Sequence, residues 1–319
     1  MNRIVAKTVA CWLGCALVAA AMLAAGPAAA QETMTEEMAR RAKLLETLPK
    51  DAAKRHFGTV KAALPGPPRT IGSYAKGCMA GARALATDGP AWQVMRLSRN
   101  RNWGHPDLIA LIERLAKAAP KEASWRGLLV GDISQPRGGP MLTGHASHQI
   151  GLDADIWLTP MPTRKLSGSE RETMTATNIV AADWMDINPQ HWTKAHVALI
   201  RLAAEQPAVA RIFVNPAIKK ALCRDAGTDR AWLSKVRPIW GHNYHFHIRI
   251  TCPAGDEACQ DQTPPPGGDG CGQEVAEWIE RQHKAYFSPR PPVTEPERPP
   301  KAMPLSAMPD ACQKIVLAR

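Results

Sequence analysis

Two short histidine-rich windows constrain this chain more than any other feature. They span residues 144–155 and 241–247, and together they hold five of the ten histidines. Imidazole nitrogens and carboxylate oxygens are zinc ligands, and a catalytic zinc ion keeps three protein ligands and one open position. The fold must therefore bring two distant segments to one point. A metal-dependent hydrolase is the leading hypothesis.

Alternation of polar and apolar side chains predicts a strand at each window. Residues 152–158 alternate, with Asp155 on the polar face. Residues 244–250 also alternate, so His245 and His247 share one polar face. The opposite face of that segment carries Tyr244, Phe246, Ile248 and Ile250. We expect the apolar face to pack on the core and the two strands to be neighbours.

These positions suggest a role for each group. We expect His148, Asp155 and His247 to ligate the metal. His145, three residues before His148, can join the same cluster. His245, one strand step from His247, is well placed to take or give a proton. For any single histidine the alternative is a structural or surface role.

The N-terminus has the pattern of a cleavable secretory signal over residues 1–30. Arg3 and Lys7 form a basic start, an apolar run follows, and residues 28–30 supply a small-residue cleavage site. The alternatives are a retained membrane helix or a lipoprotein attached through Cys15. We interpret the chain as an exported, periplasmic protein with no stable membrane insertion after cleavage.

The balance of charge favours an anionic partner. The full chain carries 40 Lys and Arg against 29 Asp and Glu, a formal net charge of +11. Loss of Arg3 and Lys7 with the signal leaves +11 − 2 = +9. An exported protein seldom meets nucleic acid, so an anionic cell-wall polymer fits better. The alternative is that the charge only keeps the protein soluble.

Six cysteines remain after removal of residues 1–30. They are Cys78, Cys223, Cys252, Cys259, Cys271 and Cys312. An even number in an exported chain predicts disulfides, although six cysteines allow about 15 pairings. A thiolate zinc site is the weaker alternative, because no CxxC pair occurs.

Periodicity and turn residues divide the chain into four parts. We predict a signal peptide at 1–30, an extension and linker at 31–69, a compact domain at 70–287, and a Pro-rich tail at 288–319 held by Cys312. Helices are predicted at 32–48, 106–118, 194–204 and 275–282, further strands at 127–133 and 211–214, and a connecting segment at 51–68.

At the histidine windows the sequence resembles the penicillin-insensitive murein endopeptidase family. The wider group includes lysostaphin-type and D-alanyl-D-alanine metallopeptidases, whose pattern is His, six residues, Asp, and later His-x-His. His148, Asp155, His245 and His247 meet that pattern. Further matching segments run from about Thr70 to Cys312. They are 71–73, 77–78, 93–96, 104–108, 144–156, 211–218, 225–230, 235–238 and 268–272.

The resemblance implies a fold, a site and a reaction. The fold would be α+β, with a small central antiparallel sheet flanked by helices, zinc on its concave face, and disulfide staples. His148, Asp155 and His247 match the zinc ligands, and His145 matches a histidine of the metal cluster. His245 matches the general base, and His242 lines the site. The implied reaction cleaves the D-alanyl–meso-diaminopimelyl cross-link of peptidoglycan without a serine nucleophile, so β-lactams would not acylate the enzyme.

The resemblance also implies disulfides Cys78–Cys312, Cys223–Cys271 and Cys252–Cys259. A second metal position is less clear. Asp183 matches a family aspartate, but Asp186 stands where the family has a histidine. The alternative is that both are plain surface or capping carboxylates.

Two other functions fit the same residues. One is a D-alanyl-D-alanine carboxypeptidase of the same metallopeptidase group. The other is a non-catalytic wall-binding module with a structural zinc ion. The oligomeric state is not predicted.

Overall fold

The computed structural model describes residues 34–288 and 302–318. The predicted signal peptide and much of the Pro-rich tail lie outside these residues. In the part described, no helix combines the length and the apolar character needed to cross a membrane.

A seven-stranded mixed sheet forms the centre of the molecule. Its order is β10-β9-β11-β8-β7-β5-β4. The strands are β4 (Asp88–Gly89), β5 (Trp92–Val94), β7 (Leu128–Val130), β8 (Asp153–Trp157), β9 (Val209–Val214), β10 (Val236–Pro238) and β11 (His245–Ile250). The strands predicted at 127–133, 152–158, 211–214 and 244–250 are thus present as β7, β8, β9 and β11.

The α+β class is confirmed, but the expected single antiparallel sheet is not. The β10/β9 and β5/β7 pairs are parallel, and the other pairs of the large sheet are antiparallel. Two smaller sheets accompany it, ordered β12-β1-β2 and β3-β6. Their strands are β1 (Arg69–Ser73), β2 (Lys76–Ala80), β3 (Arg83–Ala84), β6 (Trp103–Gly104) and β12 (Cys259–Gln260).

Amphipathic helices complete the core. The larger ones are α3 (Pro106–Glu122), α5 (Lys194–Ala204), α6 (Pro216–Asp225) and α7 (Gln273–Phe287), with the short α4 (Gly168–Thr173). Single turns of 3-10 helix are η1 (Leu97–Arg99), η2 (Ala231–Lys235) and η3 (Leu305–Ala307). His105 caps α3 and Pro106 is its first residue, a position where the missing N–H costs nothing. The buried face of α3 includes Leu108, Ile109, Leu111, Ile112 and Leu115.

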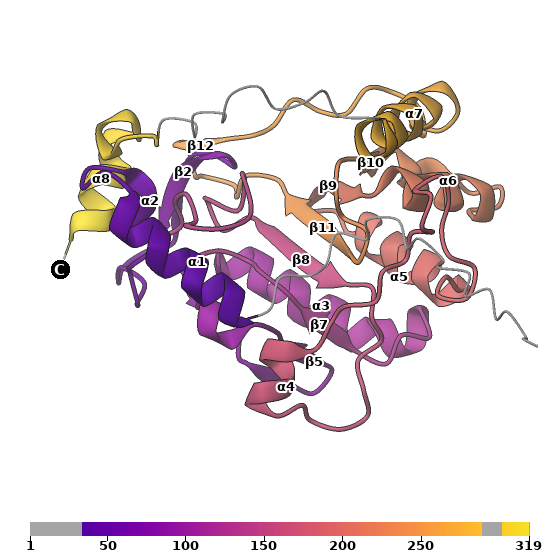
Figure 1. The fold of residues 1–319 in the computed structure, drawn as a ribbon, viewed down its shortest axis with the longest axis horizontal. Helices are drawn as coiled ribbons and strands as arrows, with labels where there is room; N and C mark the ends of the chain where they lie inside the picture. Colours follow the sequence, from indigo (N-terminus) through magenta and orange to yellow (C-terminus); the bar gives the residue numbers. More distant parts are fainter. Residues whose placement is uncertain (1–33, 289–301, 319) are drawn as a thin grey trace, which may run out of the picture.

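Helices α2 (Ala53–Phe57) and α8 (Asp310–Leu317), from opposite parts of the sequence, lie side by side next to β2 (Figure 1). They share a hydrophobic cluster that includes Phe57 and Ile315. The segment 51–68 is therefore not simply a connection, since it contributes a buried helix. The last part of the predicted tail is helical as well.

Three disulfides close the fold. They are Cys78–Cys312, Cys223–Cys271 and Cys252–Cys259. These are the pairs that the family resemblance implies. The first ties α8 to β2 across 234 residues of sequence.

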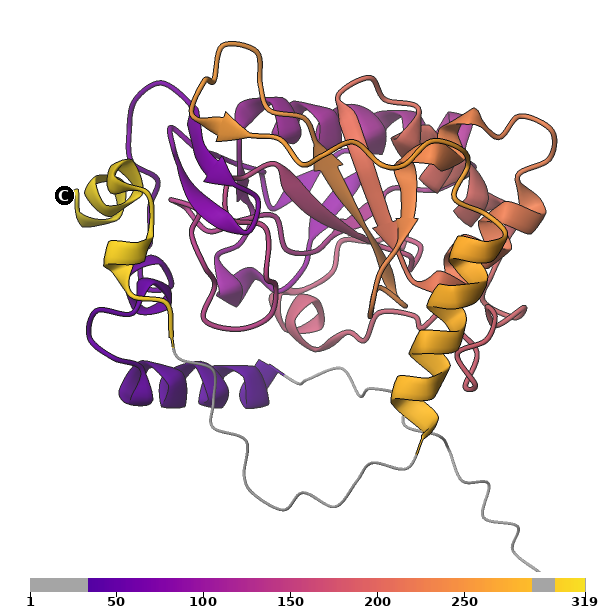
Figure 2. The ribbon, with the colours of Figure 1, turned by 90° about the horizontal axis from the view of Figure 1, so that it is seen from above.

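Helix α1 (Met34–Thr47) stands apart from the core. Figure 2 shows it on the opposite side of the molecule from α3, with the sheet between them. The helix predicted at 32–48 is thus present, but its apolar positions are not buried. Among residues 35–47, Glu37 is the only side chain that is buried.

Candidate metal centre

Antiparallel pairing of β8 and β11 brings the two histidine windows together. His247 lies opposite Asp155 and His245 lies opposite Trp157 in the register of these strands. His148 precedes β8 on a loop and has a positive φ of 66°. Such a backbone conformation is uncommon outside glycine and is typical of functional sites. Two segments far apart in sequence therefore meet at the middle of the sheet.

Asp155 lies at the centre of four histidines. Its Oδ1 is 3.5 Å from His148 Nε2, 3.5 Å from His245 Nε2 and 3.6 Å from His247 Nδ1. Its Oδ2 is 3.5 Å from His145 Nε2. One ligand atom each from His145, His148 and Asp155 lie within 4.8 Å of one another, which makes a possible metal group. His247 is not in that group, although it contacts Asp155.

The imidazole rings of His148 and His247 are each oriented by a hydrogen bond from the ring nitrogen that points away from Asp155. His148 Nδ1 donates to the Ile133 carbonyl at 2.6 Å, so its Nε2 is the nitrogen left to bind a cation. His247 Nε2 donates to Asp153 Oδ1 at 2.9 Å, so its Nδ1 faces Asp155. Metal-ligating histidines usually donate their second nitrogen to a carbonyl or carboxylate in this way.

Unpartnered buried atoms converge between these rings. The buried side-chain atoms without a hydrogen-bond partner include His148 Nε2, Asp155 Oδ1 and both ring nitrogens of His245. Buried polar atoms almost always have a partner, so such a cluster needs an explanation. A cation held by imidazole nitrogens and one carboxylate oxygen provides it, and this donor set suits zinc. The residues present therefore fit a metal ion.

The protonation states of His245, His247 and Asp155 also suit a cation. Burial, the largest effect, lowers the pKa of His245 to about 3 and that of His247 to about 4, so both rings are neutral near pH 7. Burial would raise the pKa of Asp155, but the surrounding histidines, first His245, hold it well below its usual range. For His148, burial opposes the charged ring, but the Asp155 carboxylate outweighs it and raises the pKa. Neutral imidazole and ionised carboxylate are the forms that bind metals.

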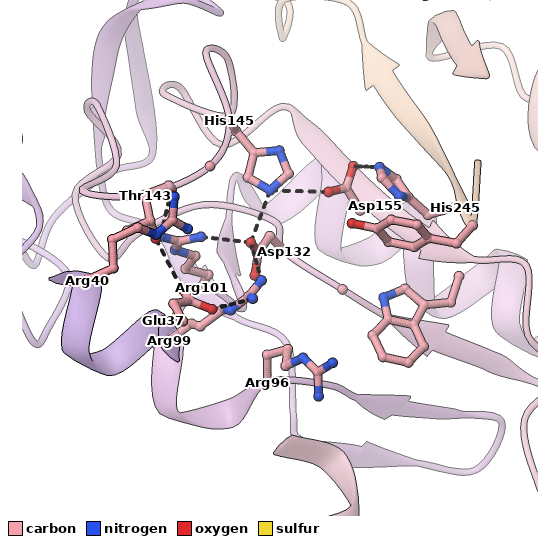
Figure 3. A pocket seen from close by; sticks show the side chains of 14 residues that line it. Glu37, Arg40, Arg96, Arg99, Arg101, Asp132, Thr143, His145, Asp155 and His245 are labelled. Carbon is pink, nitrogen blue, oxygen red and sulfur yellow. Dashed lines mark hydrogen bonds and ion pairs between the residues drawn. The ribbon is translucent and has the colours of Figure 1, made fainter. Parts of the chain in front are cut away.

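A cavity of about 220 Å³ opens beside this cluster. Asp132 Oδ2 connects the two, because it lies 3.0 Å from His145 Nε2, 2.8 Å from Arg101 Nη1 and 3.1 Å from Arg99 Nη1 (Figure 3). Tyr244 also lines the cavity. Burial, foremost, raises the pKa of this phenol to about 12, so it keeps its proton.

Sequence reasoning missed this side of the site. Asp132 stands at the end of a predicted strand, which was the one available signal. The cavity arginines lie between strands in a stretch without periodicity. Tyr244 was placed on the apolar face, but β11 begins only at His245, so strand alternation does not govern the residue before it.

Of three further residues predicted for the site, His242 lies beside the cluster, whereas Asp183 and Asp186 do not belong to it. The ring centroid of His242 is 4.7 Å from that of His245, and its buried Nε2 has no partner. Asp183 accepts a hydrogen bond from the Met185 backbone, and Asp186 pairs with Lys220 at 3.0 Å. Among the described residues, neither aspartate makes an ion pair with a histidine or belongs to the possible metal group. The second metal site stays a prediction.

Comparisons with known proteins agree with one another. The family model described as penicillin-insensitive murein endopeptidase matches residues 70–317. A protein of that name from Haemophilus influenzae is 48% identical over 229 residues, 71% of this chain and 79% of that protein. The Klebsiella pneumoniae protein of that name is 43% identical over 253 residues, 79% of this chain and 87% of its own. The Pectobacterium atrosepticum protein of that name is 42% identical over 264 residues, 83% of this chain and 89% of its own.

Proposed function

Since the chain belongs to the penicillin-insensitive murein endopeptidase family, we propose that it is a zinc-dependent enzyme that cleaves the D-alanyl–meso-diaminopimelyl cross-link of peptidoglycan. As a murein endopeptidase it acts on peptidoglycan and works in the periplasm or outside the cell. We further propose that the signal peptide at 1–30 exports it. The absence of a serine nucleophile from the proposed reaction would make it insensitive to β-lactams.

One observation carries the zinc proposal. Buried imidazole nitrogens and a buried carboxylate oxygen face one another without hydrogen-bond partners. We assign His148, Asp155 and His247 as ligands, with His145 as a further member of the cluster. Bound zinc would act as a Lewis acid and make water acidic enough to serve as a nucleophile near neutral pH.

The remaining groups have roles that follow from their surroundings. Both ring nitrogens of His245 are unpartnered and its Nε2 lies 3.5 Å from Asp155 Oδ1, so it is placed to accept a proton from the attacking water and pass it to the leaving amine. Tyr244 remains a neutral phenol and can donate a hydrogen bond to the scissile carbonyl oxygen. His242 lines the same site beside His245.

Digestion of purified muropeptide dimers tests the proposal. We expect dimers to be converted to monomers, activity to be lost with a chelator, and zinc to restore it. His245→Ala should lower kcat by about 10²- to 10⁴-fold while metal content, measured by mass spectrometry, stays the same. His283→Ala, a change at an exposed histidine of α7, is the matched control.

Each contrary outcome identifies a different error. Intact dimers in the presence of zinc would refute the endopeptidase assignment. Release of free D-alanine from monomeric pentapeptides, with dimers untouched, would make the protein a carboxypeptidase. Normal metal content without any turnover would favour a wall-binding module. Full activity in the metal-free protein would refute the role of zinc.

A further inference from the structure

Helix α1 is held by a charge rather than by an apolar face. A helix that belongs to a globular core normally buries a stripe of apolar residues. In α1, Glu37 is buried at 5% exposure, whereas Met38 beside it is 56% exposed. Among the described residues, no hydrophobic cluster includes a residue of α1. Arg41, Leu44 and Leu45 are only half-buried, so Glu37 is the side chain that α1 inserts most deeply into the rest of the protein.

Glu37 reaches into the cavity beside the metal cluster (Figure 3). Its carboxylate pairs with Arg99, and its Oε1 accepts a hydrogen bond from Thr143 Oγ1 at 3.1 Å. Arg99 also contacts Asp132, which in turn contacts His145. A continuous chain of charged groups thus runs from α1 to the proposed metal ligands.

Arg99 pairs with two carboxylates, those of Asp132 and Glu37, and Glu37 belongs to α1. Arg101 is different, because it is only 3% exposed and is engaged by Asp132 and by Thr143. Withdrawal of Glu37 would leave Arg99 with Asp132 alone and would turn its Nη2 toward the cavity. A guanidinium in such a partly desolvated site binds carboxylates strongly, often through two parallel hydrogen bonds.

We propose that Glu37 occupies a carboxylate-binding subsite formed by Arg99, and that α1 is a displaceable cover which a carboxylate of the peptide substrate must replace. The inference rests on the proposed function. The diaminopimelyl residue of the proposed cross-link carries a carboxylate next to the scissile amide nitrogen. A cationic group beside the metal cluster is where that carboxylate would lie.

Displacement of α1 from the cavity would disturb little of the remaining fold. Among the described residues, α1 contributes no side chain to a hydrophobic cluster, so its departure would expose no cluster member. An isolated helix of about this length is also only marginally stable in water. At its other end Arg55 of α2 donates to the Leu45 carbonyl, and Phe57 anchors α2 in the core. The helix can therefore leave the cavity while the chain stays attached at residues 48–52.

The test uses the full chain with Glu37→Gln and, as a matched control, Glu46→Gln. Both changes remove one negative charge from α1, but Glu46 is exposed at the far end of the helix. The probe is the soluble stem tetrapeptide, whose diaminopimelyl residue carries the carboxylate that the proposal places at Arg99, and its affinity is measured by calorimetry. Because a docked cover lowers apparent affinity by the fraction of open protein, Glu37→Gln should bind about tenfold more tightly. Glu46→Gln should match the wild type.

A second readout follows the helix itself. Adding the tetrapeptide to the wild type should speed hydrogen exchange of the amides in residues 35–47. Unchanged or weaker binding by Glu37→Gln, or α1 exchange that the peptide slows, would overturn the inference. If all variants cleave dimers alike and bind the probe alike, only the role of α1 fails. If none cleaves dimers, the proposed function fails, and probe affinity still decides the role of Glu37.

Discussion

At the scale of single residues, Asp153 holds one histidine from each window. Its Oδ1 accepts hydrogen bonds from His247 Nε2 at 2.9 Å and from Arg249 Nε at 2.7 Å. Its Oδ2 accepts one from the backbone N–H of His148 at 2.9 Å. The buried carboxylate of Asp153 thus fixes both the ring of His247 and the backbone of His148. Its contribution is orientation of the two proposed ligands His148 and His247 rather than direct ligation.

We expect Asp153→Asn to weaken zinc affinity by about 10- to 100-fold, because the amide no longer balances Arg249 and no longer fixes His247. Competition with a chromophoric chelator measures the affinity. Asp229→Asn, at a side chain that is 60% exposed and pairs with Arg201, is the control. Equal affinities in the two variants would show that the ligands are oriented without Asp153.

The residue pattern could predict the cluster of histidines around Asp155 but not the opposite wall of the site. Histidines and an aspartate on one face of alternating strands are conspicuous, because a buried polar face needs a reason. Arg99 and Arg101 come from a segment without periodicity, Asp132 stands at the end of a predicted strand, and only the fold brings their charges together. The same holds for Glu37, which meets Arg99 across 62 positions of sequence (99 − 37 = 62).

At the scale of elements, the N-terminus of α5 contains a histidine that must stay neutral. His196 is buried; its Nδ1 accepts the backbone N–H of Thr193 at 3.1 Å and its Nε2 donates to the Leu158 carbonyl at 3.0 Å. A second proton would occupy the accepting nitrogen and break the cap. Burial, the largest effect, lowers the pKa of His196 to about 4.

This arrangement predicts a loss of stability in acid. The unfolded chain binds a proton at His196 near pH 6.5, whereas the folded protein resists it until about pH 4, so the stabilisation is complete above pH 6.5 and is lost as pH falls toward 4. Between pH 7.5 and 4.5 the wild type should lose about 2–3 kcal/mol more unfolding free energy than His196→Gln. Glutamine keeps an acceptor for the cap but does not titrate. Denaturant unfolding at the two pH values measures the difference, and parallel pH profiles would contradict the prediction.

Periodic elements were predictable and non-periodic ones were not. The helix predicted at 194–204 coincides with α5, and that at 106–118 extends to Glu122 as α3. Helix α2, at five residues, is too short to show a period, so the sequence predicts only a connecting segment there. For α1 the spacing predicted the helix correctly, but it gave no sign that the buried side chain would be the carboxylate of Glu37.

At the scale of the whole molecule, one disulfide joins the C-terminal helix α8 to strand β2. Cys78–Cys312 closes 234 residues of sequence and fixes α8 against β2, where Cys312 is fully buried. Cys252–Cys259 closes only 7 residues. In the chain-entropy description, a cross-link restricts the unfolded state more when the loop it closes is longer. The two bonds should therefore differ widely in their effect on stability.

We expect replacement of both Cys78 and Cys312 by serine to lower the unfolding free energy by about 2–3 kcal/mol more than the same replacement of Cys252 and Cys259. Denaturant unfolding of the two double variants, each with its other disulfides intact, measures the difference. The first variant should also show faster hydrogen exchange in residues 310–317, because α8 then depends only on its contacts with α2 and β2. Equal losses in the two variants would mean that noncovalent packing already fixes α8 against β2, and that the long-range bond adds nothing to this contact.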